Sequence, residues 1–177
     1  MEKVHGVVRT GGFTLVELVV VILLLAVLAA VMLPRFIDAG ESAMAARLDA
    51  MAGSMRTAAD LIHAQAQLEN KTVGFDAVVT EGATIRLHSG YPRAHWMRAM
   101  RYLVRLDDVV WSPAGQICDR PWCGRGFQTS VPGAPAVSGR GGKIWPEGYT
   151  WADQCSVYYI NNEDGSAPLI GVLDADC

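Results

Sequence analysis

One apolar segment, residues 13–33, constrains this chain more than any other feature. Nineteen of its 21 residues are apolar, and Glu17 is its one charged residue. A helix of about 20 apolar residues can span a bilayer, whereas a core helix of a soluble domain keeps a polar stripe. The segment has no such stripe after Glu17. It therefore predicts a membrane span or a secretory signal sequence.

Two features disfavour an ordinary secretory signal. Glu17 lies inside what would be the apolar region of the signal, where a carboxylate is costly. No small-x-small cleavage pattern precedes Pro34. The cations Lys3 and Arg9 come before the apolar run, so we expect the N-terminus to stay in the cytoplasm and the rest to face outward.

Outside this segment the composition is that of an ordinary globular domain. The whole chain is 51% apolar and 19% charged, which excludes an intrinsically disordered chain. Because the apolar excess is confined to 13–33, a polytopic membrane protein is excluded as well. The remainder beyond residue 40 is long enough for one hydrophobic core.

The residues around Glu17 carry a specific motif. A short basic leader ends in Gly12 and is followed by Phe13-Thr-Leu-Val-Glu17, and Pro34 comes after the apolar run. This closely resembles the N-terminal signature of type IV pilins and pseudopilins. The resemblance implies that 1–12 is a leader cleaved after Gly12 by a prepilin peptidase, and that Phe13 is then N-methylated. In such a protein 13–40 is the transmembrane and polymerisation half of a long helix, and 41–177 is the globular domain.

The resemblance also gives Glu17 an assembly role. A carboxylate in hydrocarbon needs a partner, and the new amino group of Phe13 on a neighbouring subunit could supply it. The alternative is a carboxylate wetted at the membrane interface. Pro34 is the third residue that the resemblance links to assembly.

A second pattern begins at residue 41. Apolar residues recur there at alternating spacings of four and three, which predicts an amphipathic helix over 41–69 that ends near Asn70. Proline removes a backbone donor and glycine is a weak helix former. The stretch from Pro34 to Gly40 is therefore the expected place for a bend or partial unwinding. The stripe consists of Met44, Leu48, Met51, Met55, Ala58, Ile62 and Ala66.

Residues 70–177 predict a mainly β structure. Short strands are expected near 78–79, 83–88, 109–112, 142–145, 156–160 and 168–173, because apolar or alternating runs are bounded there by turn residues. The stretch 113–142 is rich in proline and glycine and reads as loop. The predicted fold class is α+β: a pilin-type long helix packed on an antiparallel sheet of about four strands.

A basic helix is predicted over 93–106. Trp96, Met100 and Leu103 share one face, and Arg98, Arg101 and Arg105 share another, with Arg93 at its start. A basic, aromatic-bearing surface can bind nucleic acid, but a solvated face or a face that meets acidic neighbours in a filament is favoured. Without the leader, Lys+Arg falls from 15 to 13 and Asp+Glu from 18 to 17, so the net charge is −4.

Four cysteines, an even number beyond a membrane-directed segment, suggest two disulfides in an oxidising compartment. Three pairings are possible, and we favour Cys118–Cys123 with Cys155–Cys177. A four-cysteine zinc site is the alternative, but its spacings fit common zinc motifs poorly. A C-terminal disulfide loop is also what the pilin resemblance implies.

No catalytic constellation, cofactor site or metal site is predicted. His63, His88 and His95 have no evident nucleophile to serve, and the acids Glu163, Asp164, Asp174 and Asp176 lack a calcium-loop spacing. A solvated acidic loop is favoured over calcium binding. The chain is therefore expected to be a structural protein and not an enzyme.

The predicted function is that of a pilin that forms a helical homopolymer for attachment, adhesion or motility, with a surface or glycan ligand as a possible partner. Gly90-Tyr-Pro92, Cys155-Ser-Val-Tyr-Tyr159 and the terminal Cys177 resemble the mannose-sensitive haemagglutinin (MSHA) branch. The expected location is the inner membrane before assembly and an extracellular filament afterwards. Two alternatives remain: a type II secretion pseudopilin, which commonly lacks paired cysteines, and a tethered lectin-like or DNA-binding module that does not polymerise.

Overall fold

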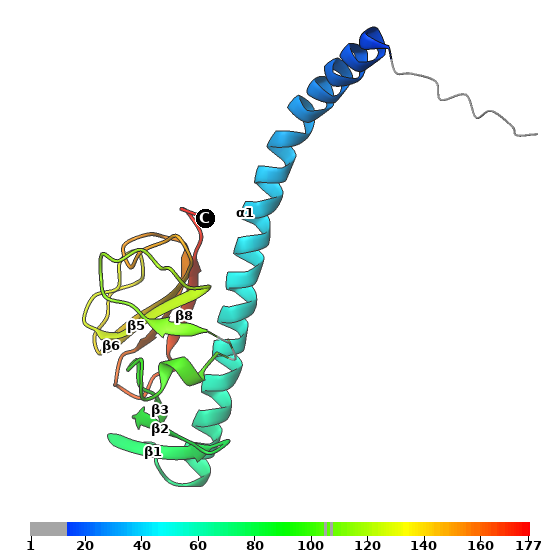
Figure 1. The fold of residues 1–177 in the computed structure, drawn as a ribbon. Helices are drawn as coiled ribbons and strands as arrows, with labels where there is room; N and C mark the ends of the chain where they lie inside the picture. Colours follow the sequence, from blue (N-terminus) through cyan, green and yellow to red (C-terminus); the bar gives the residue numbers. More distant parts are fainter. Residues whose placement is uncertain (1–13, 105, 107) are drawn as a thin grey trace, which may run out of the picture. The chain divides into compact units, whose positions relative to one another are not determined.

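The computed structural model describes residues 14–104, 106 and 108–177 (Figure 1). Gly12 and Phe13, the leader 1–12 and Arg105 lie outside the described residues. The chain divides into two units, Met1–Glu41 and Ser42–Cys177. Apart from Thr14, all described residues of the first unit belong to helix α1, which continues into the second unit.

Helix α1 runs over Leu15–Leu68, a stretch of 54 residues. The backbone is helical at Pro34 and Gly40, so the partial unwinding expected between them is wrong. The flanking residues are mostly good helix formers, and a long helix loses only one hydrogen bond at a proline. Asn70 adopts a left-handed conformation, with φ of 55°, just beyond the helix end. Its position agrees with the predicted stop.

In the second unit, the helix buries the predicted stripe. Leu48, Met51, Met55, Ile62 and Ala66 are buried, and Met44 and Ala58 pack against them. The same core contains residues from the strands, including Ile85, Ile144 and Tyr159. The helical spacing of four and three therefore identified the face that packs on the β structure.

The β structure consists of two sheets, so the prediction of one antiparallel sheet of about four strands is wrong. The first sheet has three antiparallel strands in the order β1-β2-β3. The second has five strands in the order β4-β5-β6-β7-β8, and its β4–β5 pair is parallel. The bounds are β1 Phe75–Thr80, β2 Ala83–His88, β3 Tyr91–Pro92, β4 Val109–Trp111, β5 Trp122–Gln128, β6 Arg140–Pro146, β7 Ser156–Asn161 and β8 Leu169–Leu173.

Strand β5 was missed because it lies inside the stretch 113–142 that reads as loop. Its glycines serve close packing instead of a turn. A Cβ atom at Gly124 would overlap the Trp96 ring, and one at Gly126 would overlap the Ala94 carbonyl oxygen. Only glycine allows the chain to approach β5 this closely.

The predicted helix over 93–106 is also wrong. Among the residues described there, 93–104 and 106, the only helix is the short 3-10 helix η1, Met100–Tyr102. Arg93 donates its backbone N–H to the Arg86 carbonyl oxygen at 2.9 Å, and Ala94 accepts from the Phe127 N–H at 2.6 Å. These hydrogen bonds to β2 and β5 hold the start of the segment in an extended form. The apolar side chains predicted to share a face, Trp96, Met100 and Leu103, are nevertheless buried.

Strand β6 lies in the middle of the five-stranded sheet, and alternate side chains enter two different cores. Ile144 faces the core that contains the α1 stripe, whereas Trp145 belongs to a smaller cluster with Cys118, Cys123 and Trp151. Both faces of the sheet are therefore covered. Lys143, on the Trp145 side, is completely buried as a result.

Candidate functional site

The N-terminal end of α1 is capped by the motif residues. Thr14 precedes the helix, and its hydroxyl oxygen accepts a hydrogen bond from the Glu17 backbone N–H at 3.2 Å. Threonine followed three residues later by glutamate is the pattern of a capping box. A carboxylate in the first turn also interacts favourably with the positive end of the helix dipole. Glu17 therefore has a local structural role that the sequence analysis did not assign.

The first turns of α1 expose a continuous apolar surface in the part of the unit that the structure describes. All large apolar side chains described between residues 15 and 32 are exposed, with exposed fractions from 40% to 78%. Apolar surface of this extent is unfavourable in water and marks a site of interaction with protein or lipid. Within the described residues, no helix combines the length and hydropathy needed to cross a membrane.

The sequence-predicted assembly residues are only partly described. Glu17 is exposed, and the backbone of Pro34 is part of α1. Phe13, the expected partner of Glu17 in a neighbouring subunit, is not described.

The second unit contains two disulfides. Cys155 is bonded to Cys177, which confirms the predicted C-terminal disulfide, and Cys118 is bonded to Cys123. The bond between Cys155 and Cys177 attaches Cys177 to the residue that precedes β7. Tyr149 supports it by donating its hydroxyl to the Cys177 carbonyl oxygen at 3.4 Å. The last residues thus lie against the sheet.

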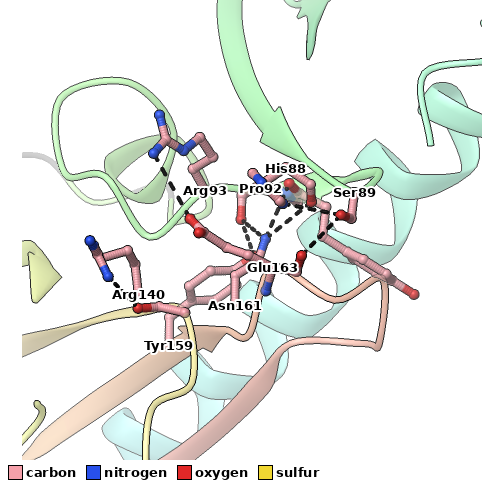
Figure 2. Close-up of polar contacts among 10 residues, drawn as sticks. His88, Ser89, Pro92, Arg93, Arg140, Tyr159, Asn161 and Glu163 are labelled. Atoms are coloured by element: carbon pink, nitrogen blue, oxygen red, sulfur yellow. Dashed lines mark hydrogen bonds and ion pairs between the residues drawn. The ribbon is translucent and has the colours of Figure 1, made fainter. Parts of the chain in front are cut away.

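A buried polar cluster joins the two sheets (Figure 2). The side-chain amide of Asn161, at the end of β7, donates to the Pro92 carbonyl oxygen at 3.0 Å and to His88 and Tyr91 at 3.4 Å each. Its side-chain oxygen accepts from the Glu163 N–H at 2.7 Å. Asn161 is 1% exposed, so this one side chain satisfies backbone groups of the three-stranded sheet and of the segment after β7 where water has little access. The sequence pattern gave no signal for it.

The predicted basic residues are not on one helix face. Arg98 and Arg101 are exposed, whereas Arg93 is half-buried and packs between the rings of Phe75 and Phe127. Arg86 from β2 and Arg140 from β6 lie close enough to lower the pKa of Arg93, in addition to the larger effect of its burial. The structure therefore replaces a helix face by a cluster built from three segments.

The histidines and acids remain dispersed. His63 stacks on Tyr91, with ring centres 3.9 Å apart, and its Nδ1 contacts the Gly90 carbonyl oxygen at 3.0 Å. Asp164 accepts hydrogen bonds from Ser166 that hold its pKa below the usual range. In the described parts of the chain, no three His, Cys, Asp or Glu residues converge as metal ligands.

Comparison with known proteins bears on the N-terminal segment. The family described as "Prokaryotic N-terminal methylation motif" matches residues 9–33, which include Gly12, Phe13 and Glu17. The chain is also 41% identical over 59 residues to the type IV narrow pilus major component PilA5 of Thermus thermophilus. This alignment covers 33% of the chain and 51% of the relative, so the chain spans about half the length of that protein. No solved structure matches.

The capped, apolar helix therefore coincides with a segment similar to the prokaryotic N-terminal methylation motif. Over 59 residues, the chain is similar to a protein described as a pilus major component.

Proposed function

We propose that the chain is a structural, non-enzymatic subunit of a bacterial type IV pilus that polymerises through the apolar half of α1. The observation that carries this proposal is the helix surface of residues 15–32, which is exposed on all sides and has one carboxylate in its first turn. Burial of apolar surface yields about 25 cal/mol per Å². Side-by-side packing of several such helices is therefore strongly favourable.

In this proposal, a prepilin peptidase cleaves after Gly12 and Phe13 is then N-methylated. Before assembly, residues 13–40 lie in the inner membrane, and the Ser42–Cys177 unit lies in the periplasm. The two disulfides support an oxidising location. After assembly the same apolar surface forms the filament core, and the subunit is extracellular. The carboxylate of Glu17 pairs with the amino group of Phe13 on a neighbour and sets the stagger between subunits.

A finer assignment is to the MSHA-type branch and to surface attachment. It rests on Gly90-Tyr-Pro92, on the β7 segment that starts after Cys155, and on the terminal disulfide. Tyr91 and Pro92 form β3 and supply carbonyl oxygens to Asn161. These residues therefore have structural tasks as well, and a glycan or other surface ligand is a further part of the proposal.

Two measurements test the filament proposal. Mass spectrometry of the purified protein should give a chain that begins at methylated Phe13. Shearing of intact cells should release the protein into a fraction that contains filaments visible by electron microscopy. A methylated chain that stays with the cells would favour the secretion pseudopilin. A chain that retains Met1 and is never released would contradict processing and assembly alike.

A further inference from the structure

Three arginines line one pocket of the second unit. The pocket has a volume of about 280 Å³ and lies beside β1 and β2; its wall consists of Phe75, Asp76, Arg86, Leu87, Arg93 and Arg98. Arg86 belongs to β2, Arg93 follows β3, and Arg98 precedes η1. A volume of this size is sufficient for a small ion or a single sugar-sized group.

The three arginines are held side by side by the backbone. The Arg86 N–H donates to the Arg98 carbonyl oxygen at 3.0 Å, and the Arg93 N–H donates to the Arg86 carbonyl oxygen at 2.9 Å. The segments that carry the three side chains are thus fixed relative to one another. A site made in this way is organised before a ligand arrives.

Arg93 is the most constrained of the three. Its guanidinium carbon lies 4.7 Å from the centre of the Phe75 ring and 5.0 Å from that of Phe127. Its Nε atom is buried and has no hydrogen-bond partner. A buried donor without a partner costs free energy, so the pocket leaves hydrogen-bonding capacity unused.

The positive charge around Arg93 is poorly balanced. Burial lowers the pKa of Arg93, and Arg98, Arg140 and Arg86 lower it further, while only Glu163 raises it. The Glu163 contact is long, at 3.9 Å. In the described chain, the side chains of Arg86 and Arg98 make no hydrogen bond or ion pair. The carboxylate in the pocket wall, Asp76, accepts a hydrogen bond from the Ala77 N–H.

We propose that this pocket binds an oxyanion, a phosphate or a carboxylate, through the guanidinium groups of Arg86, Arg93 and Arg98. Guanidinium groups present paired N–H donors that match both kinds of oxyanion. The rings of Phe75 and Phe127 hold Arg93 in place, and the partial burial of Arg93 strengthens its interaction with a charge. The proposal does not depend on filament assembly.

A single bound oxyanion fits better than a long polyanion. Nucleic acid binding uses a basic track over several phosphates, and such proteins usually have a basic balance. This chain has a net charge of −3. The arginine pocket is therefore a local exception on an acidic protein, suited to one charged group.

The test is equilibrium binding of inorganic phosphate and of glucuronate to the full chain in a neutral detergent, at constant ionic strength set by chloride. The variant R86Q/R98Q removes the two exposed arginines and leaves the packed Arg93 in place. We expect saturable binding of at least one probe, weakened about tenfold or more in the variant. The probe that binds more tightly identifies phosphate or carboxylate as the source.

A matched control removes the same charge elsewhere. Arg101 and Arg120 are exposed and lie outside the pocket, so R101Q/R120Q should bind within about twofold of the unmodified chain. Equal weakening in the two double variants would show diffuse charge attraction and overturn the site. Absence of saturable binding by both probes would overturn it too.

Discussion

Tyr159 of β7 donates its hydroxyl to the carbonyl oxygen of Pro92 in β3 at 2.6 Å, and so connects the five-stranded sheet to the three-stranded one. Both residues are buried, and burial raises the pKa of Tyr159 well above its usual range. The same carbonyl oxygen also accepts from Asn161 at 3.0 Å. The two sheets are therefore joined by a shared acceptor with two donors.

This arrangement predicts unequal effects of two substitutions. Tyr159→Phe leaves Pro92 with its second donor, so it should lower the free energy of unfolding by only about 1 kcal/mol. Asn161→Ala removes the side-chain partner of backbone groups in β2, in β3 and after β7, and should cost about 2–4 kcal/mol. Denaturant titration of the full chain measures both. A larger loss for Tyr159→Phe would contradict the shared-acceptor account.

The two disulfides should differ in their contribution to stability. In the chain-entropy account, the bond between Cys155 and Cys177, with a sequence separation of 22, is worth about 3.4 kcal/mol. The bond between Cys118 and Cys123, with a separation of 5, is worth about 2 kcal/mol. Replacing each pair by serine and comparing midpoints of thermal unfolding tests the order. Equal losses would mean that packing, not loop closure, dominates.

Lys143 should make stability depend on pH. Burial lowers its pKa from the usual 10.5 to about 8, against the opposing effect of Asp153 and Asp176. Between pH 8 and 10.5 the unfolded chain keeps a proton that the folded chain has lost, so stability rises with pH in this window. The rise is at most about 3 kcal/mol.

The control for this prediction is Lys143→Met. It keeps the apolar part of the side chain but gives up the hydrogen bonds to the carbonyl oxygens of Trp151, at 3.3 Å, and Asp153, at 3.1 Å. We expect lower stability and a flatter profile between pH 8 and 10.5. Identical profiles for the two proteins would refute the buried charge as the cause.

Two glycines should respond in opposite ways to alanine. At Gly124 a Cβ atom would overlap the Trp96 ring, so Gly124→Ala should destabilise by several kcal/mol or prevent folding. At Gly53, inside α1, nothing lies within 4 Å, so Gly53→Ala should stabilise by about 0.5–1 kcal/mol. Circular dichroism during thermal unfolding compares the pair. A neutral Gly124→Ala would disprove the close approach of β5.

The two roles of Glu17 can be separated by matched substitutions. Glu17→Gln removes the charge at nearly constant size and should give processed chains that assemble poorly. Thr14→Ala removes the capping oxygen 3.2 Å from the Glu17 N–H. It should cost the helix about 1 kcal/mol but still allow filaments. Filament yield by electron microscopy and N-terminal mass measure both, and equal yields for the two variants would contradict a special role of the charge.

The parts of this protein that depend on local pattern were predictable. Apolar spacing over 44–66 identified the buried face of α1. Apolar or alternating runs beyond residue 70 identified most strands. The motif around Glu17 indicated an N-terminal methylation signature, and a family model of that description matches residues 9–33. The disulfide of Cys155 with Cys177 was the favoured one among three possible pairings, and the structure contains it.

The parts that depend on distant contacts were not predictable. Helical spacing over 93–106 was real, but backbone hydrogen bonds from Arg86 and Phe127 decided the conformation of its first residues. Gly124 and Gly126 read as loop because their purpose, close packing against Trp96 and Ala94, involves residues far away in the chain.

The sequence by itself determined that the chain has an apolar, motif-bearing N-terminal helix and a disulfide-containing α+β unit. Hydrophobic period and motif are local properties of the chain, so they can be read without coordinates. Only the tertiary structure decided that there are two sheets, that Asn161 and Tyr159 join them, and that Arg86, Arg93 and Arg98 line one pocket. These relations arise from pairing between distant segments, which no local pattern encodes.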